Sequence, residues 1–181
     1  MSSDRWARWL LEDRFGGDED AVSRSVEMLA PIRDRVLLGA NVKRGDVVLD
    51  VGCGDGLIGF EAVLGVGETG QVMFADISDD LLDRCRQIAK DIGVSDRCRF
   101  IATPAESLDG IDNASVDVVA TRSVLIFVAD KAAAFAAFHR VLRPGGRISL
   151  FEPINRRYIA LNRDLIFGFE SAPIADLVRS G

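Results

Sequence analysis

The feature that most constrains the fold is the stretch VVLDVGCGDGLIGF, residues 47–60, in which a short apolar run leads into closely spaced glycines. The run VVL is too short for a helix and rich in β-branched residues, which predicts a strand buried on both faces. Gly52, Gly54 and Gly56 can supply the positive φ angles of a tight turn, and they lack the Cβ atoms that would hold a ligand away from the backbone. The sequence therefore predicts a strand, a ligand-binding turn and a helix.

The glycines alone leave two classes of cofactor open. Gly54, Gly56 and Gly59 also match the GxGxxG spacing of dinucleotide-binding proteins. That register begins two residues late, and Asp50 would direct a carboxylate toward a pyrophosphate, where like charges repel. Because Asp50 would instead stabilise a ligand with ammonium and sulfonium groups, it favours S-adenosylmethionine over a nicotinamide nucleotide. The structural alternative is a glycine-rich turn with a capping aspartate.

Composition narrows the class of protein. A chain of 181 residues that is 48% hydrophobic and 28% charged can form one globular domain with a sizeable core. A net charge of −6 and a pI near 4.8 argue against an interface with nucleic acid or with an anionic membrane, which favours a small-molecule substrate. Three cysteines without a CxxC pair, and no signal peptide, predict a cytoplasmic protein without disulfides or a metal site.

Strand-like and helix-like segments alternate from residue 46 onward, which predicts a doubly wound α/β fold with a mainly parallel sheet flanked by helices. Besides the first strand, the expected strands are QVMFADI (71–77), RCRFIA (97–102), VDVVATRS (116–123) and RISLFEP (147–153). One expected helix follows the cap Ser78 and places on one face Leu81, Cys85, Ile88 and Ile92. Another begins at Asp130 and contains His139, the only histidine, for which packing is the favoured role.

A second acidic residue, Asp76, ends the strand that follows the glycine turn. At the carboxyl end of a neighbouring strand a carboxylate can accept the hydroxyl hydrogens of a ribose. Both classes of cofactor predict this acid, and a helix cap or turn is its structural alternative. We interpret Asp76 as a ligand of an adenosine-containing molecule.

The order of these segments resembles the class I S-adenosylmethionine-dependent methyltransferases, in particular the methyltransferase type 11-like group. The resemblance covers residues 46–153 and includes VLDVGCGDG as the first motif, FADIS as the acidic second strand, VDVVATRSVLIFV as the fourth strand, and FHRVLRPGGR. It implies a Rossmann-like methyltransferase fold and S-adenosylmethionine as the cofactor, with S-adenosylhomocysteine as the product. It also implies a small-molecule acceptor that attacks the methyl group in line.

The resemblance assigns the cofactor site residue by residue. Asp50 and Gly52 would hold the methionine end, Asp76 the ribose, and Ile77 would pack on the adenine. Cys53 is expected to be a buried packing residue, because neighbouring aspartates raise the pKa of a thiol. The complete predicted set is Asp50, Gly52, Cys53, Gly54, Gly56, Asp76, Ile77, Ala105, Glu106 and Thr121.

The sequence departs from the family pattern at two places. In FIATPAESL, Thr103 and Pro104 replace a glycine and the aspartate that normally bonds the adenine amino group. That contact would have to come either from the backbone of Ala105 or from Glu106. After the fourth strand, IF at 126–127 stands where many relatives carry a histidine, so no catalytic histidine is assigned.

Glu152 is the weak candidate for a general base, because it lies at the carboxyl end of the last expected strand. Pairing with Arg156 or Arg157 is the alternative role of this glutamate. A catalytically silent S-adenosylmethionine-binding or scaffold protein of the same fold is the main alternative function, and a nicotinamide-dependent oxidoreductase is a more remote one.

The first 45 residues predict a helical cap. Trp6, Trp9 and Leu10 form an apolar stripe that either docks a helix on the core, the favoured interpretation, or stacks on an aromatic acceptor. A second helix is expected from 21 to 40, broken near Pro31.

Residues 154–181 are mostly helical in pattern, and no pair of strands joined by a turn is expected there. The family sheet has seven strands in the order 3-2-1-4-5-7-6, so we expect this chain to lack the last two and to be truncated. Ile148 and Leu150 would then lie on an exposed edge strand that the C-terminal segment or an oligomeric partner would cover.

Overall fold

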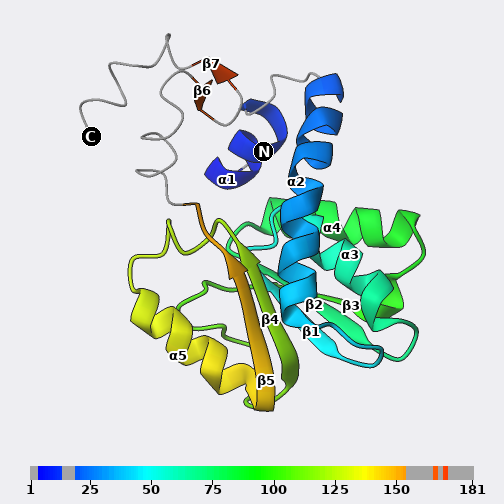
Figure 1. Cartoon of the computed structure of the whole chain (residues 1–181), viewed down its shortest axis with the longest axis vertical. Helices are drawn as coiled ribbons and strands as arrows, with labels where there is room; N and C mark the ends of the chain where they lie inside the picture. The colour runs from blue at the N-terminus through cyan, green and yellow to red at the C-terminus, as the bar shows by residue number, and fades with distance from the viewer. Residues whose placement is uncertain (1–3, 14–18, 154–164, 167–168, 171–181) are drawn as a thin grey trace. The chain divides into compact units, whose positions relative to one another are not determined.

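A computed structural model describes residues 4–13, 19–153, 165–166 and 169–170 (Figure 1). The chain divides into two compact units, Met1–Phe151 and Glu152–Gly181. The first unit contains a five-stranded sheet and the helices that cover it. The predicted α/β class is confirmed.

All five strands of the sheet are parallel, in the order β3-β2-β1-β4-β5. Their bounds are β1 Val47–Val51, β2 Gln71–Asp76, β3 Cys98–Ala102, β4 Val116–Arg122 and β5 Leu142–Phe151. In register, Val51 lies between Ala75 of β2 and Thr121 of β4. The carboxyl ends of these three strands therefore meet at one edge of the sheet, where a ligand of such a fold binds.

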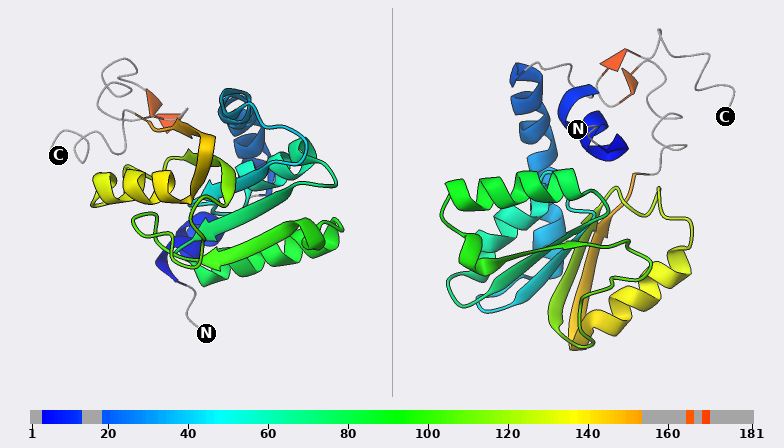
Figure 2. Two further views of the ribbon diagram at one scale, coloured as in Figure 1. Left: turned by 90° about the horizontal axis from the view of Figure 1, so that it is seen from below. Right: turned by 180° about the vertical axis from the view of Figure 1, so that it is seen from behind.

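Helices cover both faces of the sheet (Figures 1 and 2). The core on one face joins the strands to α2 Glu19–Ala40, α3 Leu57–Val66 and α4 Asp79–Asp91. The core on the other face joins them to α5 Lys131–Val141 and to apolar side chains of the loop after β3. Burial on both faces explains why VVL reads as a continuous apolar run.

The break expected near Pro31 is wrong, because α2 continues through this proline as one helix. A proline inside a helix removes one hydrogen bond and costs about 3 kcal/mol. The half of α2 after Pro31 offsets this cost by packing on the sheet, where Val36 and Ala40 are buried and Ser149 of β5 donates to the carbonyl of Val36 at 2.7 Å.

Two predictions of buried side chains are wrong. Ile92 is 56% exposed because α4 ends at Asp91, and the helix instead buries Leu81, Leu82, Cys85 and Ala89. His139 of α5 is exposed. The buried face of α5 consists of Ala134, Ala137, Phe138 and Val141, and His139 points away from it.

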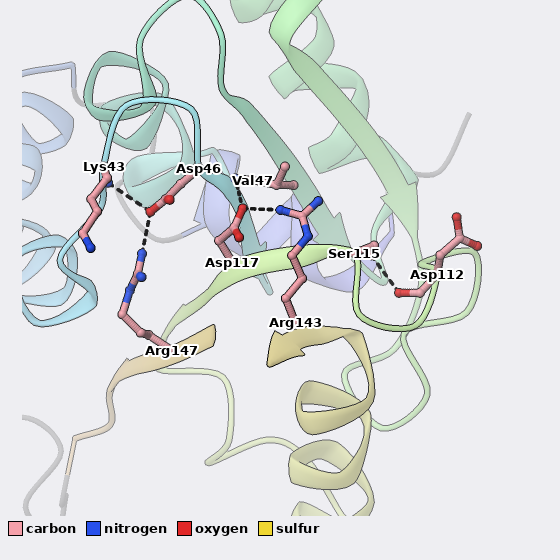
Figure 3. Close-up of polar contacts among 8 residues, drawn as sticks. All are labelled: Lys43, Asp46, Val47, Asp112, Ser115, Asp117, Arg143 and Arg147. Atoms are coloured by element: carbon pink, nitrogen blue, oxygen red, sulfur yellow. Dashed lines mark hydrogen bonds and ion pairs between the residues drawn. The ribbon is translucent and has the colours of Figure 1, made fainter. Parts of the chain in front are cut away.

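Polar contacts hold the amino ends of the strands together, opposite the edge that carries the candidate site (Figure 3). Asp117 accepts from the amide of Val47 at 2.8 Å and pairs with Arg143. Asp46 pairs with Arg147 and accepts from the amide of Lys43 at 3.0 Å. We interpret these residues as structural.

The fifth strand begins earlier than predicted and ends before Glu152. Its pairing with β4 shifts from Val116–Leu142 to Val118–Arg147, so the segment RPGG lies in an irregularity between the two paired regions. In the sheet of the described residues β5 is an edge strand, as predicted, with Ile148 39% and Leu150 40% exposed.

The prediction of a helical C-terminal segment is wrong for the residues that the structure describes there. Leu165–Ile166 (β6) and Phe169–Glu170 (β7) form an antiparallel pair of very short strands, separate from the large sheet. The remaining residues from 154 onward lie outside the described part of the chain. Pairing of the β5 edge with another segment or chain stays a prediction.

Candidate functional site

The glycine turn after β1 has the backbone conformation that the sequence predicts. Gly52, Gly54 and Gly56 have φ angles of 64°, 56° and 89°, in the left-handed region that favours glycine. A Cβ atom on Gly52 would lie 2.3 Å from a methyl group of Val124, in the loop after β4. The amides of Gly52 and Cys53 both donate to the carbonyl of Ala75, at 2.7 and 3.0 Å, which ties the turn to β2.

Asp50 caps helix α3 from within the preceding strand. Its carboxylate is buried and accepts from the amide of Gly59, in the first turn of α3, at 2.9 Å. Gly56, the N-cap residue, has no side chain to do this. Burial raises the pKa of Asp50 to about 7, and the negative charge of Asp76 contributes to the increase. Asp50 therefore has the capping role that the sequence analysis gave as its structural alternative. A positive charge on a ligand would also stabilise the ionised form of Asp50.

Asp76 joins the end of β2 to the glycine turn. Its two carboxylate oxygens accept from the amide of Gly54 at 2.9 Å and from the amide of Ser78 at 3.0 Å. Burial raises the pKa of this group, which is 8% exposed. Each carboxylate oxygen can accept a further hydrogen bond, so these contacts leave capacity for a hydroxyl donor.

The side chains expected around an adenine lie on two neighbouring segments. Ile77, directly after Asp76, is 58% exposed. The amide of Thr103 donates to the carbonyl of Asp76 at 2.9 Å, so the loop that follows β3 begins beside the end of β2. In this loop Ala105 is buried and Glu106 is half-buried.

Two further predicted residues, Thr121 and Glu152, lie outside the glycine turn and the loop after β3. Thr121 is fully buried in β4, and its hydroxyl oxygen has no hydrogen-bond partner among the described residues. Glu152 directly follows the last residue of β5. Its contact with a cofactor or an acceptor stays a prediction, and Arg156 and Arg157 lie outside the described residues.

Comparison with known proteins assigns the family. A family model of the methyltransferase domain matches residues 42–164. The ubiquinone/menaquinone biosynthesis C-methyltransferase UbiE of Klebsiella pneumoniae is 35% identical over 128 residues, which are 67% of this chain and 51% of that protein. The chain belongs to the class I S-adenosylmethionine-dependent methyltransferases. It spans about half the length of the curated relatives it matches.

Solved structures share the fold of this chain. The geranyl diphosphate C-methyltransferase of Streptomyces coelicolor, crystallised with S-adenosyl-L-homocysteine, has a TM-score of 0.62 and 20% identity, covering 67% of this chain and 42% of that one. A SAM-dependent methyltransferase of Aquifex aeolicus has a TM-score of 0.61 and 19% identity, covering 66% and 63%. The expected Rossmann-like methyltransferase fold is confirmed.

The N-terminal helix contacts the start of α4, next to Asp76. These contacts were not predicted from the sequence. Asp4 caps α1 (Arg5–Arg8) through the amides of Trp6 and Ala7, and it also accepts from the hydroxyl of Ser78. Its own amide donates to Asp80 at 2.9 Å. An aspartate before a short helical stretch is a recognisable cap, but its partners on α4 are far away in sequence.

Of the predicted apolar stripe, Trp6 and Leu10 pack on the domain, whereas Trp9 is largely exposed. The Trp6 ring meets Phe127 edge-on, with centroids 5.0 Å apart, and Trp9 is 47% exposed. Leu10 lies over the glycine turn, because a Cβ atom on Gly54 would be 3.3 Å from its side chain. Docking, the favoured interpretation of the two tryptophans, is confirmed for Trp6.

Among the described residues, no helix combines the length and the apolar character needed to cross a bilayer. The same residues contain no group of three or more potential metal ligands.

Replacing Cys53 with alanine is expected to leave cofactor affinity within about threefold of the unmodified chain, since only a small buried side chain is lost. Cys53 is 6% exposed, and both hydrogen bonding with Cys85 and burial raise the pKa of its thiol, which disfavours the thiolate. Calorimetric titration with S-adenosylhomocysteine tests the affinity. Loss of methyl transfer with intact binding would instead identify Cys53 as a nucleophile.

Proposed function

We propose that this chain transfers a methyl group from S-adenosylmethionine to a small organic acceptor by in-line SN2 attack. The observation that carries the proposal is a pair of buried carboxylates, Asp50 and Asp76, at the ends of adjacent strands on either side of a glycine turn. Burial raises the pKa of both groups, so the site is suited to a ligand that brings positive charge and hydroxyl donors.

The residues of the site suit the different parts of the cofactor. The Asp50 carboxylate would balance the ammonium group of the methionine end, and Asp76 would accept from the ribose hydroxyls. The exposed side chain of Ile77 would pack on the adenine, and backbone amides of the loop after β3 would bond its edge. The positive φ angles of the glycines shape the turn that would face the ligand, whereas the positions of their missing Cβ atoms are taken by side chains of the chain itself, such as Val124 at Gly52.

When bound, S-adenosylmethionine supplies a methyl group on a positively charged sulfur. The transfer needs an electron-rich acceptor atom opposite that sulfur, so the chain contributes mainly alignment and exclusion of water. Val124, packed on Gly52, and Leu10, packed over Gly54, are apolar groups placed to exclude water from the turn. Glu152 is the candidate base for an acceptor that must lose a proton.

The acceptor side of the site has an apolar rim. Trp6 of α1 meets Phe127 of the loop after β4, and Phe127 is 61% exposed. Ile126 beside it is 39% exposed. Exposed aromatic and aliphatic groups next to a polar cofactor site favour an acceptor that is largely apolar or aromatic. The C-methyltransferase name of the curated relative fits a carbon acceptor.

Replacing Asp76 with alanine is expected to weaken binding of S-adenosylhomocysteine by roughly 1 to 3 kcal/mol, because the ribose hydroxyls of the bound ligand would lose their acceptor. The amides of Gly54 and Ser78 lose this acceptor as well, so thermal unfolding must be recorded for the same variant. Calorimetry measures the affinity. Asp83→Ala is the control, since this carboxylate lies on α4 with its side chain 72% exposed.

An unchanged affinity in Asp76→Ala would remove this residue from the cofactor site. A wild-type chain that binds neither S-adenosylmethionine nor S-adenosylhomocysteine would contradict the proposed function. A chain that binds both but transfers no labelled methyl group to a panel of apolar and aromatic acceptors would favour the silent binding protein.

A further inference from the structure

Arg140 of α5 binds the loop between β3 and β4 through four hydrogen bonds. One guanidinium nitrogen donates to the carbonyl of Ile111 and to the side-chain oxygen of Asn113, both at 2.8 Å. Another donates to the carbonyls of Ser107 and Leu108, at 2.9 and 3.0 Å. A single side chain of α5 therefore bonds three backbone carbonyls of this loop.

The contacts of Arg140 support a strained part of this loop. Leu108 has a φ angle of 48°, which is unusual for a residue other than glycine, and its side chain is fully buried. In the described part of the chain, the carbonyls of Ser107 and Ile111 accept from no donor other than Arg140. Removing the guanidinium would leave these two acceptors unsatisfied, and the strained turn would keep only its backbone bonds to the carbonyls of Pro104 and Leu108.

The same loop contains the atoms that would have to recognise the adenine. Thr103 is tied to β2, and Pro104 has neither an N–H group nor a polar side chain. The amides of Ala105 and Glu106 come next, and they donate to no atom of the described residues. A ring nitrogen of the base is an acceptor, so its recognition by this loop falls to these backbone amides, whose direction is set by the conformation of the loop.

We propose that Arg140 is a positioning residue that sets selectivity for the base of the cofactor. It holds the carbonyls of Ser107 and Leu108, directly after the amides of Ala105 and Glu106, and so fixes the direction of these amides. The inference rests on the proposed function, because it places the adenine of S-adenosylmethionine against this loop.

The chemistry of the base supplies a direct test. N1 of adenine is an acceptor that a fixed amide can bond. N1 of hypoxanthine carries a hydrogen, so an amide held in the same place would meet a second donor. S-adenosylhomocysteine and S-inosylhomocysteine differ only in this edge of the base. The ratio of their dissociation constants therefore reports the direction of the amides.

The experiment compares this ratio in the wild-type chain, Arg140→Met and Arg143→Met by calorimetry. We expect the wild-type chain to prefer the adenine compound by at least about tenfold, the loss that follows from one unsatisfied donor. In Arg140→Met the preference should fall below about threefold, because the amides are no longer held. Arg143→Met should keep the wild-type ratio, because Arg143 pairs with Asp117 at the other end of the strands (Figure 3).

Each outcome decides the question. An unchanged ratio in Arg140→Met would overturn the proposal, even if both ligands bound more weakly, and so would a wild-type chain that binds both compounds equally. Binding of neither compound by the wild-type chain would refute the proposed function itself. If Arg140→Met does not fold, Arg140→Lys replaces it, and an intermediate ratio supports the proposal. A chain that folds with neither substitution would show that the role of Arg140 is purely structural, which also overturns the proposal.

Discussion

Replacing Gly59 with alanine is expected to lower the free energy of unfolding by about 3 kcal/mol or more, the upper end of the usual range for overpacking a core. A Cβ atom at this position would lie 2.2 Å from a ring carbon of Phe74. That ring is fully buried between Phe60 and Phe100, with centroids 4.9 and 5.1 Å away, so it cannot move aside. Helix α3 would have to shift from the sheet.

Urea unfolding of Gly59→Ala and Gly65→Ala measures this effect against a control in the same helix. A Cβ atom on Gly65 would lie 3.2 Å from a methyl group of Val42, so little has to move. The helix preference of alanine over glycine is worth about 1 kcal/mol, and we expect Gly65→Ala to stay within that amount of the wild-type chain. Equal stability of the two variants would show that Phe74 can repack.

The elements near the cofactor site were predictable because local rules determine them. The turn after β1 needs positive φ angles, which predicts Gly52, Gly54 and Gly56 in their observed conformations. Ser78 caps α4 and Asp130 caps α5, as the polar residue before each apolar pattern indicates. The alternation of strands and helices then leaves few topologies, of which the parallel sheet is the usual one.

Contacts between residues distant in sequence were not predictable. The bond between Asp4 and Ser78, and the four bonds of Arg140, depend on how the helices and loops pack together in the folded chain. The continuity of α2 through Pro31 has the same origin, since packing on β4 and β5 outweighs a local preference. Periodicity also misplaced Ile92, because the end of a helix is less certain than its centre.

Replacing Asp50 with asparagine is expected to stabilise the ligand-free chain at pH 8 and to leave its stability almost unchanged near pH 4. The pKa of Asp50 is about 7 in the folded chain, because of burial, against an ordinary value of 3.8. Between these values the folded state binds more protons than the unfolded state, so the free energy of unfolding falls as the pH rises. Above about pH 7 the destabilisation is complete, with an upper bound of roughly 4 kcal/mol.

Asparagine keeps an acceptor for the amide of Gly59 but carries no charge, so this part of the pH dependence should disappear. Urea unfolding at several pH values between 4 and 8 gives the difference between the variant and the wild-type chain. Asp83→Asn is the control, because this carboxylate lies on α4 with its side chain 72% exposed. A variant that is less stable than the wild-type chain at pH 8 would mean that the buried charge is already balanced.

The same substitution should have the opposite effect on cofactor binding. A bound ammonium group would favour the ionised form of Asp50 and lower its pKa, so the affinity of the wild-type chain for S-adenosylhomocysteine should rise as the pH increases toward 7. Asp50→Asn should bind about tenfold or more weakly at pH 8, since the charge-assisted contact is lost, and its affinity should vary less with pH. Calorimetry at pH 5.5 and 8 tests both statements. An equal affinity of the two chains at pH 8 would limit the role of Asp50 to capping α3. If Asp50→Asn is instead more stable but loses the cofactor, this carboxylate is kept for binding at the expense of stability.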